Sequence, residues 1–570
     1  MATKRYFEFS EGTSNKFWEV WRDGVQVFTR YGKIGANGQV TVKKLGSDGE
    51  AKKLHDKLVN EKTGKGYVES GGKTAKPAAN GKGSGKPNGK AAKADASDQP
   101  EIIVIPEGAV RLEVVEGKSA KFWQIHRNEK TVTVTFGKIG TPGTVQKKKY
   151  KDEWDARSDV KKQLEEKKKK GYQYVMAGPR ITPPPAAVNP QLEAAIVKDR
   201  SDDGYLVYGD WLMEQGDPRG ALAAIKGTDN KAQNKASALA WKNRQFFYGP
   251  WAIFTVEKPQ EDDAISATWK QGWMDTLRLS ATNSWRVDRI TVSDCADLVR
   301  NIPKVASARL LRELVIGCPV GESEFTFGNT IKELVKAMPS MPNLRRLVLG
   351  DFTYEDSELS WSHLGSLKDF WKVAGKLEYL KIHAGSMDLG KIDAPELREL
   401  WIETGGFDKK NVEQIANANA PKLETLNLWF GQDNYGCDLQ LKHYASLIEA
   451  LPKKFPKLKR LGLANCTYGN EVLELLAKSK IVKQVETLDV SKSHITTAGL
   501  QALGDNAKAF KHLGVLDLSE CLLDAAGKKL AKPMAKKVEL DDQDDPSDHQ
   551  PDPDHPDEDD SWWRYSRVGE

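Results

Sequence analysis

The chain has 570 residues, more than a single hydrophobic core supports, so we expect three to five domains. It holds no run of about 18 apolar residues, and its first residues lack the apolar core of a signal peptide, so we expect a cytoplasmic protein without a membrane span. Five widely spaced cysteines argue against a disulfide framework and fit a reducing compartment.

The formal net charge of +6 hides a strong asymmetry between the two ends of the chain. Residues 1–185 carry 37 lysine and arginine residues against 22 aspartate and glutamate residues, a net charge of +15. The rest of the chain carries 49 against 58, a net charge of −9. A basic front half indicates an anionic partner, most often a nucleic acid, although a lysine-rich linker that only aids solubility explains the charge equally well.

Residues 1–69 have the pattern of a small sheet followed by one helix. The Asp23-Gly24 dipeptide is a strong hairpin turn signal between two apolar segments. Ser47, with Glu50 three residues later, predicts the start of a helix, which we expect to end near Gly64–Gly66. The predicted strands lie at residues 7–9, 17–21 and 25–28.

Residues 70–106 are expected to form a basic low-complexity linker. Glycine, alanine, proline and asparagine dominate its first part, and residues 70–94 hold six lysines and no acid. Such a composition buries too little apolar surface to fold, so the segment is interpreted as a flexible tether that adds weak phosphate contacts at most.

Residues 107–176 repeat the first domain at a constant offset of 105 residues, with no gap between the matching segments. The length of the match identifies an internal repeat of a whole small domain. The second helix ends in four lysines, 167–170, which suit either a solvated helix end or contact with DNA. The matching segments are 11–18 with 116–123, 31–35 with 136–140, and 66–67 with 171–172.

Both copies resemble WGR domains, which are small β-rich modules of DNA-damage-responsive poly(ADP-ribose) polymerases and of several bacterial proteins. The resemblance rests on the aromatic pair of a strand, on the aromatic-Gly-Lys-Ile-Gly turn, and on the Gly-Tyr that ends the helix. Both copies depart from the motif, since its Trp is Tyr31 or Phe136 and its Arg is Lys33 or Lys138.

The resemblance implies a nucleic-acid site at these turns. In the polymerases the motif Trp packs on the sugar of a terminal nucleotide, and the Arg contacts the same DNA end. Lysine keeps the charge but loses the bidentate fork, so phosphate binding survives the change better than recognition of an end. The expected nucleic-acid-binding residues are Tyr31, Lys33, Phe136, Lys138, Lys16 and Lys121, although their alternative role is that of a structural turn with exposed lysines.

Residues 177–188 are a proline-rich spacer, and residues 189–226 resemble the short helical repeat-companion domain that precedes leucine-rich repeats in some bacterial proteins. The Asp210-Trp211-Leu212 and Gly216–Gly220 words carry this second resemblance. We interpret the acids Asp202, Asp203 and Asp210 as helix caps or as partners of Arg219 rather than as metal ligands.

Residues 227–540 are expected to form lead-in helices and a leucine-rich-repeat array. The word L-x-x-L-x-L recurs nine times, and each word predicts a strand whose leucines point inward. Stacking such repeats buries a continuous core and leaves a concave face that suits a protein partner. The words begin at residues 274, 311, 344, 377, 397, 423, 458, 485 and 513.

For several residues of this array, the sequence is compatible with either a structural role or a binding role. Cys466 and Cys521 occupy the inward position of the repeat pattern and are expected to be structural. Trp401, Trp429 and Phe430 follow or interrupt strand words, where they either pack in the core or anchor a partner.

Residues 541–570 are expected to be a disordered acidic tail that ends in aromatics. Eleven aspartate and glutamate residues lie within 541–560, beside His549 and His555. We do not expect these histidines to bind a metal, because divalent sites need a fixed geometry. The end, Ser561–Tyr565, is interpreted as a possible docking peptide. The tail either aids solubility or lies on the basic front half and competes with DNA.

No motif of an enzyme active site, metal site or cofactor loop is present in the sequence, so we expect no catalysis and no cofactor. The expected fold class is α+β multidomain: two sheet-plus-helix WGR-like domains, a short helical domain, an irregular α/β leucine-rich-repeat solenoid and a disordered acidic tail. The sequence favours a bacterial adaptor that binds nucleic acid, with DNA as the expected form, through its front half and protein through its rear half. The alternative is a protein-interaction scaffold that binds no nucleic acid.

Overall fold

The computed structural model describes residues 4–11, 14–33, 39–64, 67–69, 102–106, 108–117, 119–179, 183–256, 263–281, 294–321, 324–549 and 564–568. Contacts divide the chain into two compact units, Met1–Ser97 and Asp98–Glu570. The architecture is mixed α/β and multidomain, with small sheet domains in the N-terminal half and a larger mixed sheet after them.

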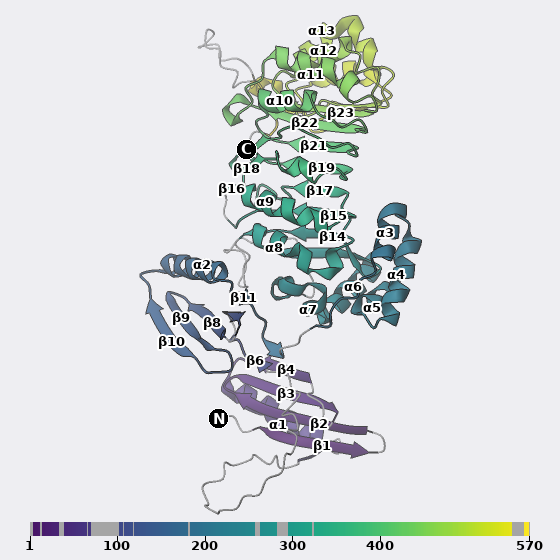
Figure 1. Ribbon diagram of the computed structural model, residues 1–570. Helices are drawn as coiled ribbons and strands as arrows, with labels where there is room; N and C mark the ends of the chain where they lie inside the picture. Colours follow the sequence, from purple (N-terminus) through teal and green to yellow (C-terminus); the bar gives the residue numbers. More distant parts are fainter. Residues whose placement is uncertain are drawn as a thin grey trace, which may run out of the picture. The chain divides into compact units, whose positions relative to one another are not determined.

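The first unit is a five-stranded antiparallel sheet with one helix (Figure 1). The strand order is β4-β3-β2-β1-β5. Phe7, Trp18 and Val20 of the sheet pack against Ala51 and Val59 of the helix, which gives the unit its own core. The elements are β1 (Arg5–Glu11), β2 (Ser14–Asp23), β3 (Gln26–Lys33), β4 (Gln39–Lys44), α1 (Asp48–Gly64) and β5 (Val68–Glu69).

Local signals account for the start and the end of α1. The Glu50 N–H donates to Ser47 Oγ at 3.3 Å, and the Glu50 carboxylate accepts from the Gly46 N–H at 3.0 Å. This differs from the expected capping box in one respect, because the carboxylate reaches one residue further back. The helix ends at Gly64, inside the expected range.

The second unit begins with a sheet domain of the same topology, ordered β10-β9-β8-β7-β11. Leu112, Trp123 and Ile125 form its core together with Val132 and the helix residue Ala156. The internal repeat is therefore a repeat of structure as well as of sequence. The elements are β7 (Ala109–Glu116), β8 (Ser119–Asn128), β9 (Thr131–Lys138), β10 (Thr144–Lys149), α2 (Glu153–Lys169) and β11 (Gln173–Tyr174).

Parts of the expected linker and of the expected spacer are structured. Strand β6 (Ile102–Ile103) lies within the expected linker, and it pairs antiparallel with β12 (Gly178–Pro179) of the expected spacer. Ile103 is buried in this pairing. An apolar segment at the end of the basic linker thus pairs with a strand 75 residues later in the chain, since Ile103 is the register partner of Gly178.

Short helices follow and pack against the start of the larger sheet. Ile196, Tyr205 and Tyr208 share one core with Trp273 and Leu310, so the helical stretch is not separate from what comes next. The helices are α3 (Pro190–Asp199), α4 (Asp202–Glu214), α5 (Pro218–Ala223), α6 (Asn230–Lys242), α7 (Arg244–Phe247) and the 3-10 turn η1 (Gly249–Phe254).

The larger sheet has eleven strands, which are stacked in chain order (Figure 1). The first pair is antiparallel and the following pairs are parallel. Each of the nine leucine words lies on one strand from β14 to β25, so the strand positions are confirmed. The strands are β13 (Ile265–Lys270), β14 (Trp273–Leu279), β15 (Glu313–Ile316), β17 (Arg346–Leu349), β19 (Tyr379–His383), β21 (Glu399–Glu403), β22 (Thr425–Gly431), β23 (Arg460–Cys466), β24 (Thr487–Asp489), β25 (Val515–Asp517) and β26 (Lys537–Glu539).

The second leucine of each word forms a ladder of buried side chains through the sheet. Neighbours in the ladder are direct register partners, so each repeat covers the apolar side of the one before it. Return segments carry α8 (Cys295–Asn301), α9 (Gly328–Ala337), α10 (Lys409–Ala416), α11 (Leu441–Lys454), α12 (Gly469–Lys478), α13 (Thr497–Leu503) and α14 (Ala525–Ala531), and the small parallel sheet of β16 (Phe325–Thr326), β18 (Ser362–Ser366) and β20 (Ser386–Asp388).

The last part of the chain differs from the expected disordered tail at two places. Residues 541–549 continue from the sheet and include a 3-10 turn at Pro546–Asp548. Residues 564–568 lie against the repeats, with Tyr565 only 4% exposed. His555 and the two tryptophans of the expected docking peptide lie outside the described residues, as does most of the acidic segment.

Of the helices that the structure describes, none is both long enough and apolar enough to cross a bilayer.

Candidate nucleic-acid interface

Strand pairing brings the expected lysines together in pairs. Lys16 on β2 is the register partner of Lys33 on β3. In the second copy, Lys121 on β8 is the register partner of Lys138 on β9. Directly opposite residues of an antiparallel pair share one face, and like charges at these positions destabilise the sheet. The same unfavourable pairing therefore occurs at the same place in both domains.

Three of the four lysines have no acidic neighbour within the described part of the chain. Lys16, Lys121 and Lys138 are exposed, and no described carboxylate lies within ion-pair distance of any of them. The backbone of Lys33 belongs to β3, but its side chain lies outside the described residues. The side chains of Lys16, Lys121 and Lys138 therefore present their charges to solvent.

The two expected aromatic residues lie beside the lysines, on the same face of their strands. Tyr31 pairs with Trp18 and is 41% exposed. Phe136 pairs with Trp123, is half-buried and packs against the core of the second domain. Part of the Tyr31 ring is therefore exposed to solvent, whereas Phe136 contributes mainly to packing.

The turn after Lys138 is described in the second copy only, because residues 34–38 of the first copy lie outside the described residues. The Ile139 N–H donates to the Ala120 carbonyl at 3.1 Å, and the Thr141 hydroxyl donates to the Lys138 carbonyl at 2.7 Å. These bonds hold the turn against the strand, and they leave the side chain of Lys138 in solvent.

A glycine completes this turn. Gly143 has a φ of +74°, and a Cβ there would come within 2.6 Å of the Phe122 ring and 2.8 Å of the Phe136 carbonyl oxygen. Gly38 stands 105 positions earlier, so this spacing was a further sequence signal of the turn.

A lysine near the end of the helix covers the core tryptophan in both copies. Lys62 lies 5.7 Å from the centre of the Trp18 ring and 4.9 Å from that of Tyr67. Lys167 lies 5.5 Å from the Trp123 ring and 5.2 Å from that of Tyr172. The Gly-Tyr word that ends the repeat thus supplies one wall of a cation–aromatic contact.

The lysine run 167–170 divides into two structural and two exposed residues. Lys167 packs on the rings, and burial, together with the charge of Lys170, lowers its pKa. Lys168 donates to Asp297 at 2.6 Å and also pairs with Glu165. Of these four lysines, only Lys169 and Lys170 are exposed.

Two features of the domains were missed in the sequence. All six residues of β10 are exposed, and they include Lys147, Lys148 and Lys149. On the other face of the first sheet, the rings of Trp21 and Phe28 stack at 5.2 Å with 4° between their planes, and Lys4 lies over Trp21. Side chains alternate between the two faces along β2 and β3, so Trp21 and Phe28 lie on the face away from the core. This alternation is visible in the sequence.

The acids of the helical stretch have different partners from those expected. Arg219 is fully buried and pairs with Asp217 at 2.8 Å rather than with Asp202, Asp203 or Asp210. It also lies 4.4 Å from the Trp273 ring and donates to the Ala187 carbonyl. Asp202 pairs with Lys270. The expected partners of Arg219 were wrong, because Asp217 caps α5 two residues before Arg219 and its carboxylate accepts from both the backbone N–H and the guanidinium of Arg219.

In the larger sheet, the two tryptophans and the neighbouring phenylalanine have different surroundings. Phe430 is fully buried. Trp401 and Trp429 are half-buried on the face opposite the leucines, with Arg460 at 5.5 Å and Lys492 at 5.6 Å from their rings. Cys466 and Cys521 are buried, and burial raises the thiol pKa of both, as their expected structural role requires.

Comparisons with known proteins identify the two small domains. The WGR domain family matches residues 3–74 and 109–179, so the chain carries two WGR domains. Protein YehF of Escherichia coli (strain K12) is 37% identical over 65 residues, which are 11% of this chain and 24% of the length of YehF.

Solved structures also show similarity to the chain. A crystal structure of a protein from Bacteroides fragilis has 22% sequence identity and a TM-score of 0.43, covering 77% of this chain and 97% of that one. An internalin from Listeria monocytogenes has 14% identity and a TM-score of 0.25, covering 47% of this chain and 67% of that one.

Proposed function

We propose that this chain is a non-catalytic adaptor. Its two WGR domains bind nucleic acid, most readily DNA, through the paired strand lysines. Its larger sheet, which we infer to be a leucine-rich-repeat solenoid, binds a protein. The pairing of Lys16 with Lys33 and of Lys121 with Lys138 carries the nucleic-acid part of the proposal.

The lysine pairs support this function because they cost stability without a ligand. Two cations held opposite each other repel, and each pair gains an attractive interaction only when an anion lies between or beside them. DNA carries one negative charge per about 3.4 Å of each strand, so both cations of a pair meet phosphates at once. The exposed lysines of β10 extend the positive surface of the second domain.

The residue types at this site support contacts with the phosphate backbone of a nucleic acid rather than recognition of its base sequence. Lysine presents a point charge, whereas arginine offers the bidentate fork that reads bases or grips a terminal phosphate. The exposed ring of Tyr31 adds a flat surface for a sugar or a base. We therefore expect binding that depends strongly on salt and weakly on sequence. Two modules in one chain add affinity through effective concentration.

The outward face of the larger sheet supports a protein partner. Trp401 and Trp429 lie on neighbouring strands, each beside a cation, on the side away from the leucine ladder. Half-buried tryptophans of this kind supply much of the energy in protein interfaces.

Binding of the full chain to a fluorescent nicked duplex of about 30 base pairs, measured by anisotropy from 50 to 200 mM salt, tests the nucleic-acid function. Changing Lys16, Lys33, Lys121 and Lys138 to Glu removes four phosphate contacts and introduces repulsion. We expect a loss of at least a hundredfold at 50 mM salt, and a salt slope smaller by about 3 to 4 units.

The matched control makes the same charge change outside the WGR domains, at four exposed lysines that have no described ion pair. An unchanged affinity in the quadruple WGR variant, or an equal loss in the control, contradicts the proposal. The control residues are Lys231, Lys235, Lys304 and Lys376.

One observation favours the alternative of a protein-interaction scaffold. Trp154, in the first turn of α2, is 75% exposed, and a tryptophan in that position is a common anchor of protein interfaces. If the wild-type chain binds neither duplex nor single-stranded nucleic acid at 50 mM salt, the WGR domains act through such contacts.

A further inference from the structure

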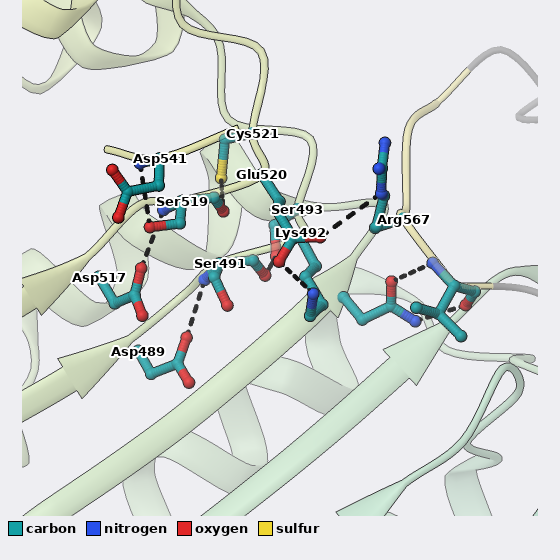
Figure 2. A network of polar contacts seen from close by, with 12 residues as sticks. Asp489, Ser491, Lys492, Ser493, Asp517, Ser519, Glu520, Cys521, Asp541 and Arg567 are labelled. Atoms are coloured by element: carbon teal, nitrogen blue, oxygen red, sulfur yellow. Dashed lines mark hydrogen bonds and ion pairs between the residues drawn. The ribbon is translucent and has the colours of Figure 1, made fainter. Parts of the chain in front are cut away.

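The segment Arg564–Val568 lies at the carboxyl ends of three neighbouring strands of the larger sheet. Its contacts come from Asn465 at the end of β23, from residues 492–494 after β24 and from Glu520 after β25. These turns follow strands of one parallel sheet, so they form one continuous edge. Figure 2 shows Arg567 directed toward this edge, with Lys492, Ser493 and Glu520 beside it.

The segment binds in the manner of an added strand. Ser566 forms an antiparallel bridge with Ser493, and the Arg567 N–H donates to the Lys492 carbonyl at 3.2 Å. The Tyr565 N–H donates to Nδ1 of His494 at 3.1 Å. Main-chain bonds of this kind hold an extended peptide whatever its sequence, and side-chain pockets then select among peptides.

Asn465 continues the backbone recognition with its side chain. Its Oδ1 accepts from the Val568 N–H at 2.9 Å, and its Nδ2 donates to the Val568 carbonyl at 2.6 Å. The amide thus offers one acceptor and one donor, as a neighbouring strand would. Asn465 has a φ of +53°, a conformation that asparagine tolerates better than most residues.

The side chains of the segment meet complementary groups. Tyr565 is buried against the ring of His549, whose centre lies 4.8 Å away. Arg564 pairs with Glu471 at 3.2 Å and lies over the ring of Tyr468 at 4.6 Å. The site therefore accommodates an aromatic residue, Tyr565, that is preceded by a cation, Arg564, and followed by a small residue, Ser566.

The second cation of the segment lies in acidic surroundings. Arg567 pairs with Asp544 at 2.8 Å and with Glu520 at 3.4 Å. Glu520 is also paired with Lys492. Arg567 and its acids are partly exposed, so solvent screens these ion pairs and each one contributes little to holding the segment.

The edge formed by Asn465, residues 492–494 and Glu520, here called the acceptor edge, has hydrogen bonds of its own in two of its turns. The Ser491 N–H donates to Asp489 at 3.0 Å, and the Ser519 N–H donates to Asp517 at 2.9 Å, in equivalent turns of successive repeats (Figure 2). Lys492 and Glu520 follow with the same left-handed backbone, at φ values of +63° and +53°. The repeat itself therefore builds the turns that receive the segment.

We propose that this edge is a peptide-recognition site that residues 564–568 occupy in cis. Its partner is an extended segment of another protein with the same chemistry, in which an aromatic and a small hydroxyl residue lie between two cations. The partner binds when the chain's own segment leaves, which its few and partly exposed ion pairs permit. This inference rests on the protein-binding part of the proposed function, and it places a protein-binding site at the turns that follow β23, β24 and β25.

The test uses the full chain with the changes Tyr565→Gly and Arg567→Glu, which weaken the cis segment but leave the acceptor edge intact. A fluorescein-labelled peptide with the sequence of residues 562–570 serves as the probe. We expect this released variant to bind the probe at least tenfold more tightly than the wild type, because the cis segment competes at an effective concentration on the order of millimolar. A probe peptide with Tyr565→Ala is expected to bind at least tenfold more weakly.

Adding Asn465→Gly to the released variant removes the side-chain amide and keeps a residue that accepts positive φ. It is expected to abolish binding of the probe. Hydrogen exchange of the amides in β23 and β24 confirms that each variant is folded. The proposal is overturned if the folded released variant leaves the probe unbound at 500 μM, or if Asn465→Gly has no effect. No nucleic acid is involved, so failure here is distinct from failure of DNA binding.

Discussion

At the scale of single residues, His494 shows how a buried polar group is used. It is 7% exposed, and its Nδ1 accepts the hydrogen bond from the Tyr565 N–H, a bond that requires the neutral ring. Burial lowers its pKa from 6.5 to about 4, and the charges of Arg564 and His549 add to the shift.

This shift predicts a loss of stability in mild acid. The folded-state pKa lies below the unfolded value, so the unfolded chain takes up the proton first as the pH falls. The contribution of His494 is complete above pH 6.5 and is lost progressively down to about pH 4. Between pH 7 and pH 5 we expect the wild type to lose about 2 kcal/mol more than the variant His494→Gln. Urea unfolding at both pH values measures this, and equal pH dependence of the two proteins contradicts it.

At the scale of elements, the turn between β9 and β10 positions Lys138 opposite Lys121. It depends on Gly143, where a side chain meets both a ring and a carbonyl oxygen. Gly117, in the turn between β7 and β8, also has a positive φ, +55°, but a Cβ there meets nothing within 4 Å. Substitutions at these two glycines therefore distinguish the cost of a left-handed backbone, which both share, from the cost of a steric clash, which only Gly143 has.

We therefore expect Gly117→Ala to cost about 1 kcal/mol, for the left-handed backbone alone. Gly143→Ala is expected to cost at least about 2 kcal/mol more, because the Phe122 ring and the turn must move. Hydrogen exchange of the amides in β8 and β9 measures the local free energy of opening in the full chain. Equal effects of the two substitutions would contradict the steric clash that the structure shows for a side chain at residue 143.

At the scale of the whole molecule, the chain consists of two units with separate cores. Phe7, Trp18 and Val20 belong to a core within the first unit, whereas the leucine ladder belongs to the second. Units that share no core unfold independently.

Calorimetry of the full chain should therefore resolve a first-unit transition that core substitutions move selectively. Phe7→Ala removes a ring that is 1% exposed and should destabilise the first unit by about 3–5 kcal/mol, without moving the transitions of the second. Leu426→Ala, in the ladder, should have the reverse effect. A single transition that both substitutions shift alike would contradict the division into units.

The sequence by itself determined the elements whose signals are local. The Asp23-Gly24 hairpin, the capping residue Ser47 before α1 and the nine leucine-rich motifs were visible because each depends on neighbours within about one turn or one strand. The offset of 105 residues was visible because the sequence itself repeats. Strand register places the six expected site residues at equivalent positions in the two small sheets, and their role in binding stays a prediction.

Only the tertiary structure decided which of these residues meet. Strand register places Lys16 opposite Lys33, folding buries Arg219 with Asp217, and the repeats receive Arg564–Val568. The bonds from Asn465 to Val568 span 103 residues. This last contact leaves no periodic trace in the chain, because the turns that receive Val568 exist only after the repeats have stacked.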